Sequence, residues 1–199
     1  MSCSPKEYNN DMTPNEGFFL YQLRTYKERG VIASLFIDPK NPDDFVAGYV
    51  EAVTPRQVLL RSISPFGRFD GFMVVRLCDI FMILGEDDYT VRLSRLLAAR
   101  SQPMTDGIPA NEGEDLIHAL CRHAAEENSM VTLWLHDDVE HIGRIVHLDD
   151  MRVTVGEVDY FGLDPRPATF ALRDVEMASL GSEDEIMYQL LADQQPAIV

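Results

Sequence analysis

Hydrophobic and polar residues alternate along this chain in a pattern that occurs twice. When the sequence is shifted by 95 residues, the segment Phe45–Ile83 aligns with Glu140–Ala178 without a gap. Gly48 then falls on Gly143, and the apolar positions of the two segments coincide although few residues are identical. A duplicated domain keeps such a pattern after its surface has diverged. The sequence therefore predicts two related domains.

The pattern of each copy predicts a helix, five short strands and a second helix. In the first copy, Thr13 and Glu16 have the spacing of a capping box, and Gly30 is placed to end the helix. Gly48 lies inside the second strand, where a glycine marks the sharp bend that closes a small barrel. The elements predicted for this copy are helix 14–29, strands 31–38, 45–53, 57–64, 71–77 and 79–84, and helix 89–100.

The second copy repeats this order after a segment rich in proline and glycine, which is typical of a linker. Pro165 and Pro167 restrict the start of its fourth strand to a sheet edge or a loop. The elements predicted for this copy are helix 112–127, strands 130–136, 141–148, 152–158, 168–172 and 174–179, and a last helix through Leu191.

These elements predict a mainly β fold with flanking helices (α+β), built from two tandem five-stranded barrels. Each barrel has a helix before it and a helix after it. The predicted organisation is a flexible tail at 1–12, barrel copy one at 13–100, a linker at 101–111, barrel copy two at 112–192 and a tail at 193–199.

The two halves of the chain differ in net charge. The formal net charge is -16, of which residues 1–110 carry -2 and residues 111–199 carry -14. Because nucleic-acid affinity comes largely from cations that neutralise phosphates, the second half should repel RNA and DNA. The nearly neutral first half could still present an arginine patch. Acidity also serves solubility, which is the simpler explanation of the excess.

The sequence carries no sign of a membrane protein or of a disulfide framework. No apolar run is long enough to span a bilayer, and residues 1–12 lack the apolar segment of a secretory signal. The chain has three cysteines, an odd number, without a CxxC spacing. This usage predicts reduced thiols and a cytoplasmic location.

The layout resembles that of Sm-like proteins (LSm or Hfq-like), which are small five-stranded barrels that follow a helix. The resemblance covers roughly Gly17–Leu84 and Leu116–Leu180. It is carried by the helix-to-strand entry RGVIASLF at residues 29–36 and by GRIVHLDDM at residues 143–151, which follows the family's first motif. Other SH3-type barrels share much of this pattern.

Members of this family commonly bind RNA in rings, but the residues that do so differ in this chain. Gln57 and Arg152 stand where Sm-like proteins place an RNA-contacting asparagine, and the second motif is replaced by RLC at 76–78 and ALR at 171–173. Only Arg76 can be carried over by position. Because one fold hosts many tasks, function has to be argued from the site.

One candidate site lies in the first copy, where guanidinium groups occur with glutamine and aromatic side chains. Such groups can stack on and neutralise single-stranded RNA or bind another ligand. The alternative is that the arginines are solvated at strand ends and the aromatics close the barrel. The residues of this candidate RNA or ligand site are Arg56, Gln57, Arg61, Phe66 and Arg76.

A metal site and an enzyme are weaker hypotheses. The segment 136–141 (HDDVEH) offers imidazoles and carboxylates that suit zinc, but its spacing matches no established site. No GxSxG, P-loop or GxGxxG motif is present. We therefore expect no catalytic residue, no metal and no cofactor. Asp79 and Asp174 recur before the fifth strand, which suggests that both cap backbone amides.

The apolar fourth and fifth strands of the first copy suggest pairing with the second copy or with another chain. The leading hypothesis is a non-catalytic interaction or scaffold protein that binds a protein or a small ligand. The alternatives are a divergent RNA-binding regulator that acts through copy one and a metal-dependent enzyme.

Overall fold

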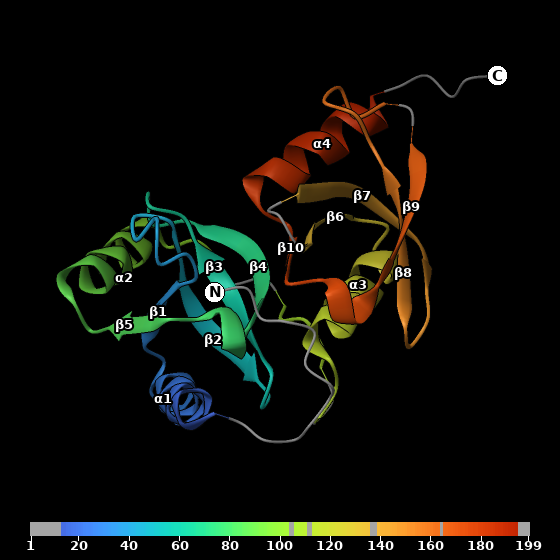
Figure 1. Cartoon of the computed structure of the whole chain (residues 1–199). Helices are drawn as coiled ribbons and strands as arrows, with labels where there is room; N and C mark the ends of the chain where they lie inside the picture. The colour runs from blue at the N-terminus through green and yellow to red at the C-terminus, as the bar shows by residue number, and fades with distance from the viewer. Residues whose placement is uncertain (1–12, 104–105, 111–112, 136–138, 164, 195–199) are drawn as a thin grey trace. The chain divides into compact units, whose positions relative to one another are not determined.

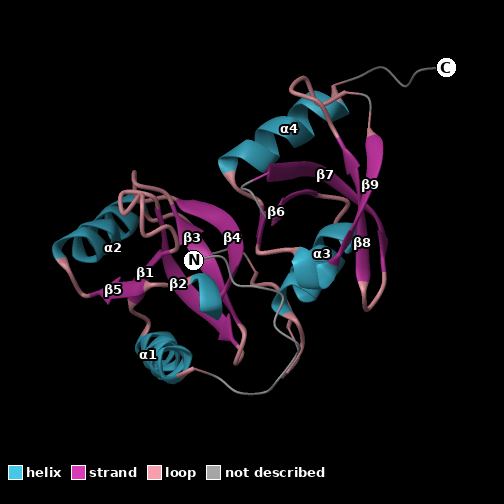
Figure 2. Cartoon of the chain, viewed as in Figure 1, coloured by secondary structure: helices cyan, strands magenta, loops and turns pink. Residues whose placement is uncertain are grey.

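A computed structural model of the chain describes residues 13–103, 106–110, 113–135, 139–163 and 165–194. Within these ranges the protein has a mixed α+β fold with four α-helices and ten antiparallel strands (Figures 1 and 2). Contacts divide the chain into two compact units. Among the described residues, the first unit comprises 13–69 and 75–103, and the second comprises 70–74 and those from 106 to 194.

The first unit places its strands in the order β5-β1-β2-β3-β4. Helix α1 packs on β2, and α2 packs near β1 (Figure 1). A small core cluster includes Ile32, Ile63 and Leu93. The elements of this unit are α1 (Pro14–Arg29), β1 (Ile32–Phe36), β2 (Phe45–Val53), β3 (Gln57–Ile63), β4 (Phe69–Arg76), β5 (Met82–Gly85) and α2 (Asp88–Arg100).

Local signals in the sequence fix both ends of α1. The backbone N–H of Glu16 donates to Thr13 Oγ1 at 3.3 Å, and the backbone N–H of Thr13 donates to Glu16 Oε2 at 2.6 Å. Gly30 ends the helix in the left-handed conformation, with φ 61°, where glycine carries no Cβ penalty. The predicted capping box and both ends of this helix are confirmed.

The second unit repeats the arrangement, with its strands in the order β10-β6-β7-β8-β9. Strand β9 ends this order and contains Pro167, which agrees with the predicted edge position. The buried face of α3 includes Leu120 and Cys121, and burial raises the pKa of the Cys121 thiol to about 12. The elements of this unit are α3 (Leu116–Glu126), β6 (Met130–Leu135), β7 (Val139–Leu148), β8 (Arg152–Glu157), β9 (Arg166–Ala171), β10 (Met177–Leu180) and α4 (Glu183–Asp193).

The bending glycines have the same surroundings in both units. A Cβ on Gly48 would lie 2.3 Å from the carbonyl oxygen of Arg61, and a Cβ on Gly143 would lie 2.2 Å from that of Gly156. Two strands approach so closely here that only glycine fits. The register of the strand pair shifts just beyond each glycine, between Val50 and Ala52 and between Ile145 and His147.

Two sequence-based expectations about the sheet need correction. The outermost strands of each order, β5 with β4 and β10 with β9, are not neighbours, so the pairing described for each unit is that of an open sheet and not of a closed barrel. The fifth strands also begin later than predicted, because Leu77–Asp79 and Leu172–Asp174 form single 3-10 turns, η1 and η2. Among the described residues, Asp79 accepts hydrogen bonds from Arg76 Nε at 2.5 Å and from Cys78 Sγ at 3.6 Å, and from no backbone amide.

The middle of β4 contributes to the second unit, where it contacts the start of α4. The backbone N–H of Glu183 donates to Asp70 Oδ1 at 2.9 Å. Gly71 has φ +69°, and a Cβ there would lie 2.2 Å from the carbonyl oxygen of Leu180. These contacts hold the first turn of α4 in place.

No helix in the described part of the chain is long and apolar enough to cross a membrane.

Candidate interaction surfaces

The five residues of the predicted RNA or ligand site do not come together. Arg56 and Gln57 precede or begin β3, Arg61 lies within it, and Phe66 follows it. At about 3.3 Å per residue, the two ends of this strand lie roughly 20 Å apart. The structure therefore separates the predicted site into three places, which have different chemistry.

Arg61, in the middle of β3, is a structural residue. Its side chain is buried, with 3% of the residue exposed, and its Nε donates to Glu51 Oε1 at 2.6 Å. Its guanidinium also lies 5.8 Å from the ring centroid of Phe69, in the geometry of a cation–π contact. Contact with RNA would require this ion pair to break.

Arg56, Gln57 and Arg76 gather at one end of the sheet, next to η1. The backbone N–H of Leu77 donates to the carbonyl oxygen of Arg56 at 2.8 Å, and Gln57 is buried. Arg76 is held by Asp79 through the 2.5 Å bond described above. This end of the unit is a hydrogen-bonded junction between two turns.

The second unit builds the same junction with different side chains. The backbone N–H of Leu172 donates to the carbonyl oxygen of Met151 at 2.9 Å. Hydrogen bonds from the backbone N–H of Met151 and from Arg152 outweigh the effect of desolvation and lower the pKa of Asp149 to about 2. Thr54 accepts the equivalent backbone bonds in the first unit. The repetition favours a structural role for both junctions.

Phe66 lies at the other end of β3, beside α2. It is 71% exposed, and its carbonyl oxygen accepts a hydrogen bond from Arg100 Nε at 3.0 Å. A Cβ on Gly67, which has φ +68°, would lie 2.3 Å from Leu96 Cβ, so this loop packs directly on the helix. Phe66 is therefore the predicted site residue that lies next to α2.

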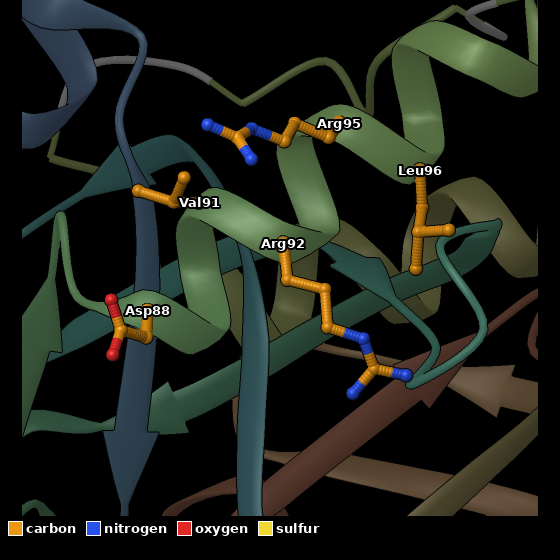
Figure 3. Close-up of a pocket in the computed structure, with 5 residues that line it drawn as sticks. All are labelled: Asp88, Val91, Arg92, Arg95 and Leu96. Atoms are coloured by element: carbon orange, nitrogen blue, oxygen red, sulfur yellow. The ribbon is translucent and has the colours of Figure 1, made fainter.

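Helix α2 presents an open hollow of about 340 Å³ that contains two arginines. Figure 3 shows Arg92 and Arg95 extending from the helix in different directions. Within the described ranges neither of them forms an ion pair. Asp88 is the acidic residue that lines the hollow. We define the α2 face as Phe66, Val91, Arg92, Arg95 and Leu96.

The equivalent surface of the second unit is apolar, although it lies on a helix that begins with acidic residues. Tyr160 and Phe161 are 77% and 65% exposed, and Leu190 is 57% exposed. A Cβ on Gly162, which has φ +75°, would lie 2.9 Å from Leu191 Cβ, so the loop before β9 packs on α4 as its counterpart packs on α2. We define the α4 face as Tyr160, Phe161, Ile186, Met187, Leu190 and Leu191.

Helix α4 turns a glutamate inward and its apolar side chains outward. Glu185 is 2% exposed, and its Oε1 accepts hydrogen bonds from Thr132 Oγ1 at 2.7 Å and from Ser179 Oγ. Its Oε2 accepts a bond from the backbone N–H of Ser182 at 2.7 Å. Because this carboxylate occupies the inward position, the apolar residues on the other side of the helix face solvent.

Sequence reasoning did not identify the α4 face. Its apolar residues have the spacing of a core-facing helix, and the partners of Glu185 lie as far away in the sequence as Thr132. The available signal was the repeat itself, because Phe66 and Phe161 occupy equivalent loop positions before equivalent helices.

The structure describes residues 139–141 of the candidate metal site. Residues 136–138 lie outside the described residues, whereas His141 contacts Glu157 through Nδ1 and packs on Phe170 at a centroid distance of 4.3 Å. Where the structure describes the chain, it contains no group of three His, Cys, Asp or Glu residues that could hold a metal ion.

Comparison with known proteins adds no family assignment: no protein-family model matches the chain, and no curated protein matches it.

Proposed function

We propose that this protein is a non-catalytic interaction protein whose second unit binds a protein partner through the α4 face. The single observation that carries the proposal is that this helix exposes Ile186, Met187 and Leu190 while it buries Glu185. Exposed apolar side chains that gather on one surface mark interaction sites, and Tyr160 and Phe161 add the aromatic groups that are enriched there.

The duplication supports the assignment of these faces to binding. Both units expose a phenylalanine in the loop that packs on the helix, and both place an exposed β-branched residue at the same helical position, Val91 and Ile186. A surface that keeps exposed apolar residues in two diverged copies is not explained by the core of either copy.

We infer that each unit is an open variant of the Sm-like module. The inference is supported by the helix that leads into five short strands and by the glycine at the bend of the second strand, Gly48 or Gly143. A cytoplasmic location, expected from the cysteine usage, belongs to the same proposal.

RNA is the alternative partner of the first unit. Phe66, whose loop packs on α2, and the arginines Arg92 and Arg95 of that helix favour an anionic partner, because guanidinium and aromatic groups suit single strands. The burial of Arg61 and the net charge of -16 oppose RNA. We therefore propose a protein, and not RNA, as the partner.

Site-specific photocrosslinking tests the proposal in cells that express the full chain. A photoreactive phenylalanine analogue at Phe161 is expected to give discrete protein adducts on illumination, because this ring lies in the α4 face. The same analogue at Tyr21, which is 72% exposed on α1, is the matched control and is expected to give a background level of adducts. Equal labelling at the two positions would show that the α4 face binds no partner.

A further inference from the structure

We propose that the α4 face binds the α2 face of a second copy of this chain. The inference rests on the proposed function, because it names the occupant of the same surface. Three observations support it: the two faces share apolar positions, the charges on and beside them are opposite, and within the described residues the arginines have no ion-pair partner.

The two faces share a set of apolar positions. Phe66 and Phe161 occupy equivalent loop positions, and Leu96 and Leu191 pack against the equivalent loop glycines. Such residues bury apolar surface on contact, which contributes about 25 cal/mol for each Å² removed from water. The exposed apolar residues therefore allow either face to serve as a contact surface.

The charges of the two faces favour a contact between an α2 face and an α4 face. Arg92 and Arg95 line the α2 face, whereas Glu183 and Asp184 in the first turn of α4 lie on or beside the rows that carry Met187 and Leu190. On a helix, residues three, four or seven apart lie on the same side. Two α2 faces would bring like charges together, whereas the α2 face and the acidic first turn beside the α4 face are complementary.

The arginines of the α2 face are available for such a contact. In the described part of the chain neither Arg92 nor Arg95 has an ion-pair partner. Their hollow holds one acidic side chain, Asp88. A second copy supplies carboxylates for these arginines, from the first turn of its α4. It also supplies the apolar side chains of its α4 face, which can enter the hollow.

Reciprocal charge reversal tests this inference with the full-length chain. The first variant carries Arg92→Glu and Arg95→Glu, so its α2 face is acidic like the first turn of its α4. The second carries Glu183→Lys and Asp184→Lys, so the helix turn beside its α4 face becomes basic like its α2 face, and circular dichroism checks that α4 still forms. Sedimentation velocity at low salt measures the association of each protein as a function of concentration.

The wild-type chain is expected to associate with rising concentration, and salt is expected to weaken this association. Each variant alone is expected to associate at least about tenfold more weakly, because like charges then face each other. An equimolar mixture of the two variants is expected to recover association, since every face again meets an opposite charge.

The inference is overturned if the wild-type chain stays monomeric at low salt or if the mixture stays dissociated. If the chain is monomeric but binds a labelled single-stranded RNA, and the Arg92→Glu, Arg95→Glu variant loses this binding, the α2 face is an RNA site instead. Adducts of Phe161 with a different protein would overturn self-association but keep the proposed function. If the analogue at Phe161 gives no protein adducts, both self-association and the proposed function are wrong.

Discussion

Replacement of Gly143 by alanine is expected to destabilise the second unit by about 3 kcal/mol or more. The added Cβ would lie 2.2 Å from the carbonyl oxygen of Gly156 and 2.7 Å from its carbonyl carbon. Both atoms belong to the backbone of β8, so no side-chain rotation can relieve the clash. The β7–β8 pairing has to open at the point where the sheet bends.

Urea denaturation monitored by fluorescence measures this effect, because Trp134 in β6 is the only tryptophan and lies in the second unit. The control is Gly17→Ala in α1, where a Cβ would meet nothing within 4 Å; because this glycine lies in the first unit, its effect is followed by circular dichroism. That substitution is expected to be neutral or to stabilise by about 0.5–1 kcal/mol, since alanine favours a helix. A Gly143→Ala protein with an unchanged urea midpoint would show that the two strands do not approach as described.

Replacement of Glu185 by alanine is expected to cost about 2–4 kcal/mol of unfolding free energy. The substitution removes the acceptor of two buried hydroxyl groups, Thr132 Oγ1 and Ser179 Oγ, and the partner of the Ser182 N–H. Buried polar groups left without partners carry the full cost of desolvation. Glu185→Gln keeps one side-chain oxygen and is expected to lose about half as much.

The same fluorescence measurement tests this second prediction. The control is Glu183→Ala, which removes an exposed carboxylate two residues away and is expected to change stability by less than about 1 kcal/mol. A loss below about 1 kcal/mol for Glu185→Ala, or equal losses for the alanine variants at 183 and 185, would contradict the role of the buried carboxylate.

Local signals explain which parts of the fold could be predicted from the sequence. The ends of α1 follow from Thr13, Glu16 and Gly30, which act within a few residues of one another, and those ends are confirmed. The bounds of β2 were also predicted correctly. The 3-10 turns were missed because they depend on a bond from the Leu77 N–H to Arg56, which is distant in the sequence.

The candidate site was harder to predict because side-chain burial depends on tertiary partners. Arg61 is of a residue type that often binds RNA, but its guanidinium forms an ion pair with Glu51 on the adjacent strand. The apolar residues of α4 have the pattern of a core face, but Thr132 and Ser179 supply donors that draw Glu185 inward instead. The partners of Arg61 and of Glu185 can be assigned only when the register of the strands is known.

Methionine footprinting tests the central claim, that a partner covers the α4 face in the cell. Met187 lies in this face, and Met151 is an exposed methionine of the same unit that lies outside it. Peroxide oxidation of both residues is compared by mass spectrometry in intact cells and in the purified chain at high dilution. We predict that Met187 is protected relative to Met151 in cells and is oxidised freely in the dilute protein. An equal ratio of Met187 to Met151 oxidation in the two samples would contradict the account.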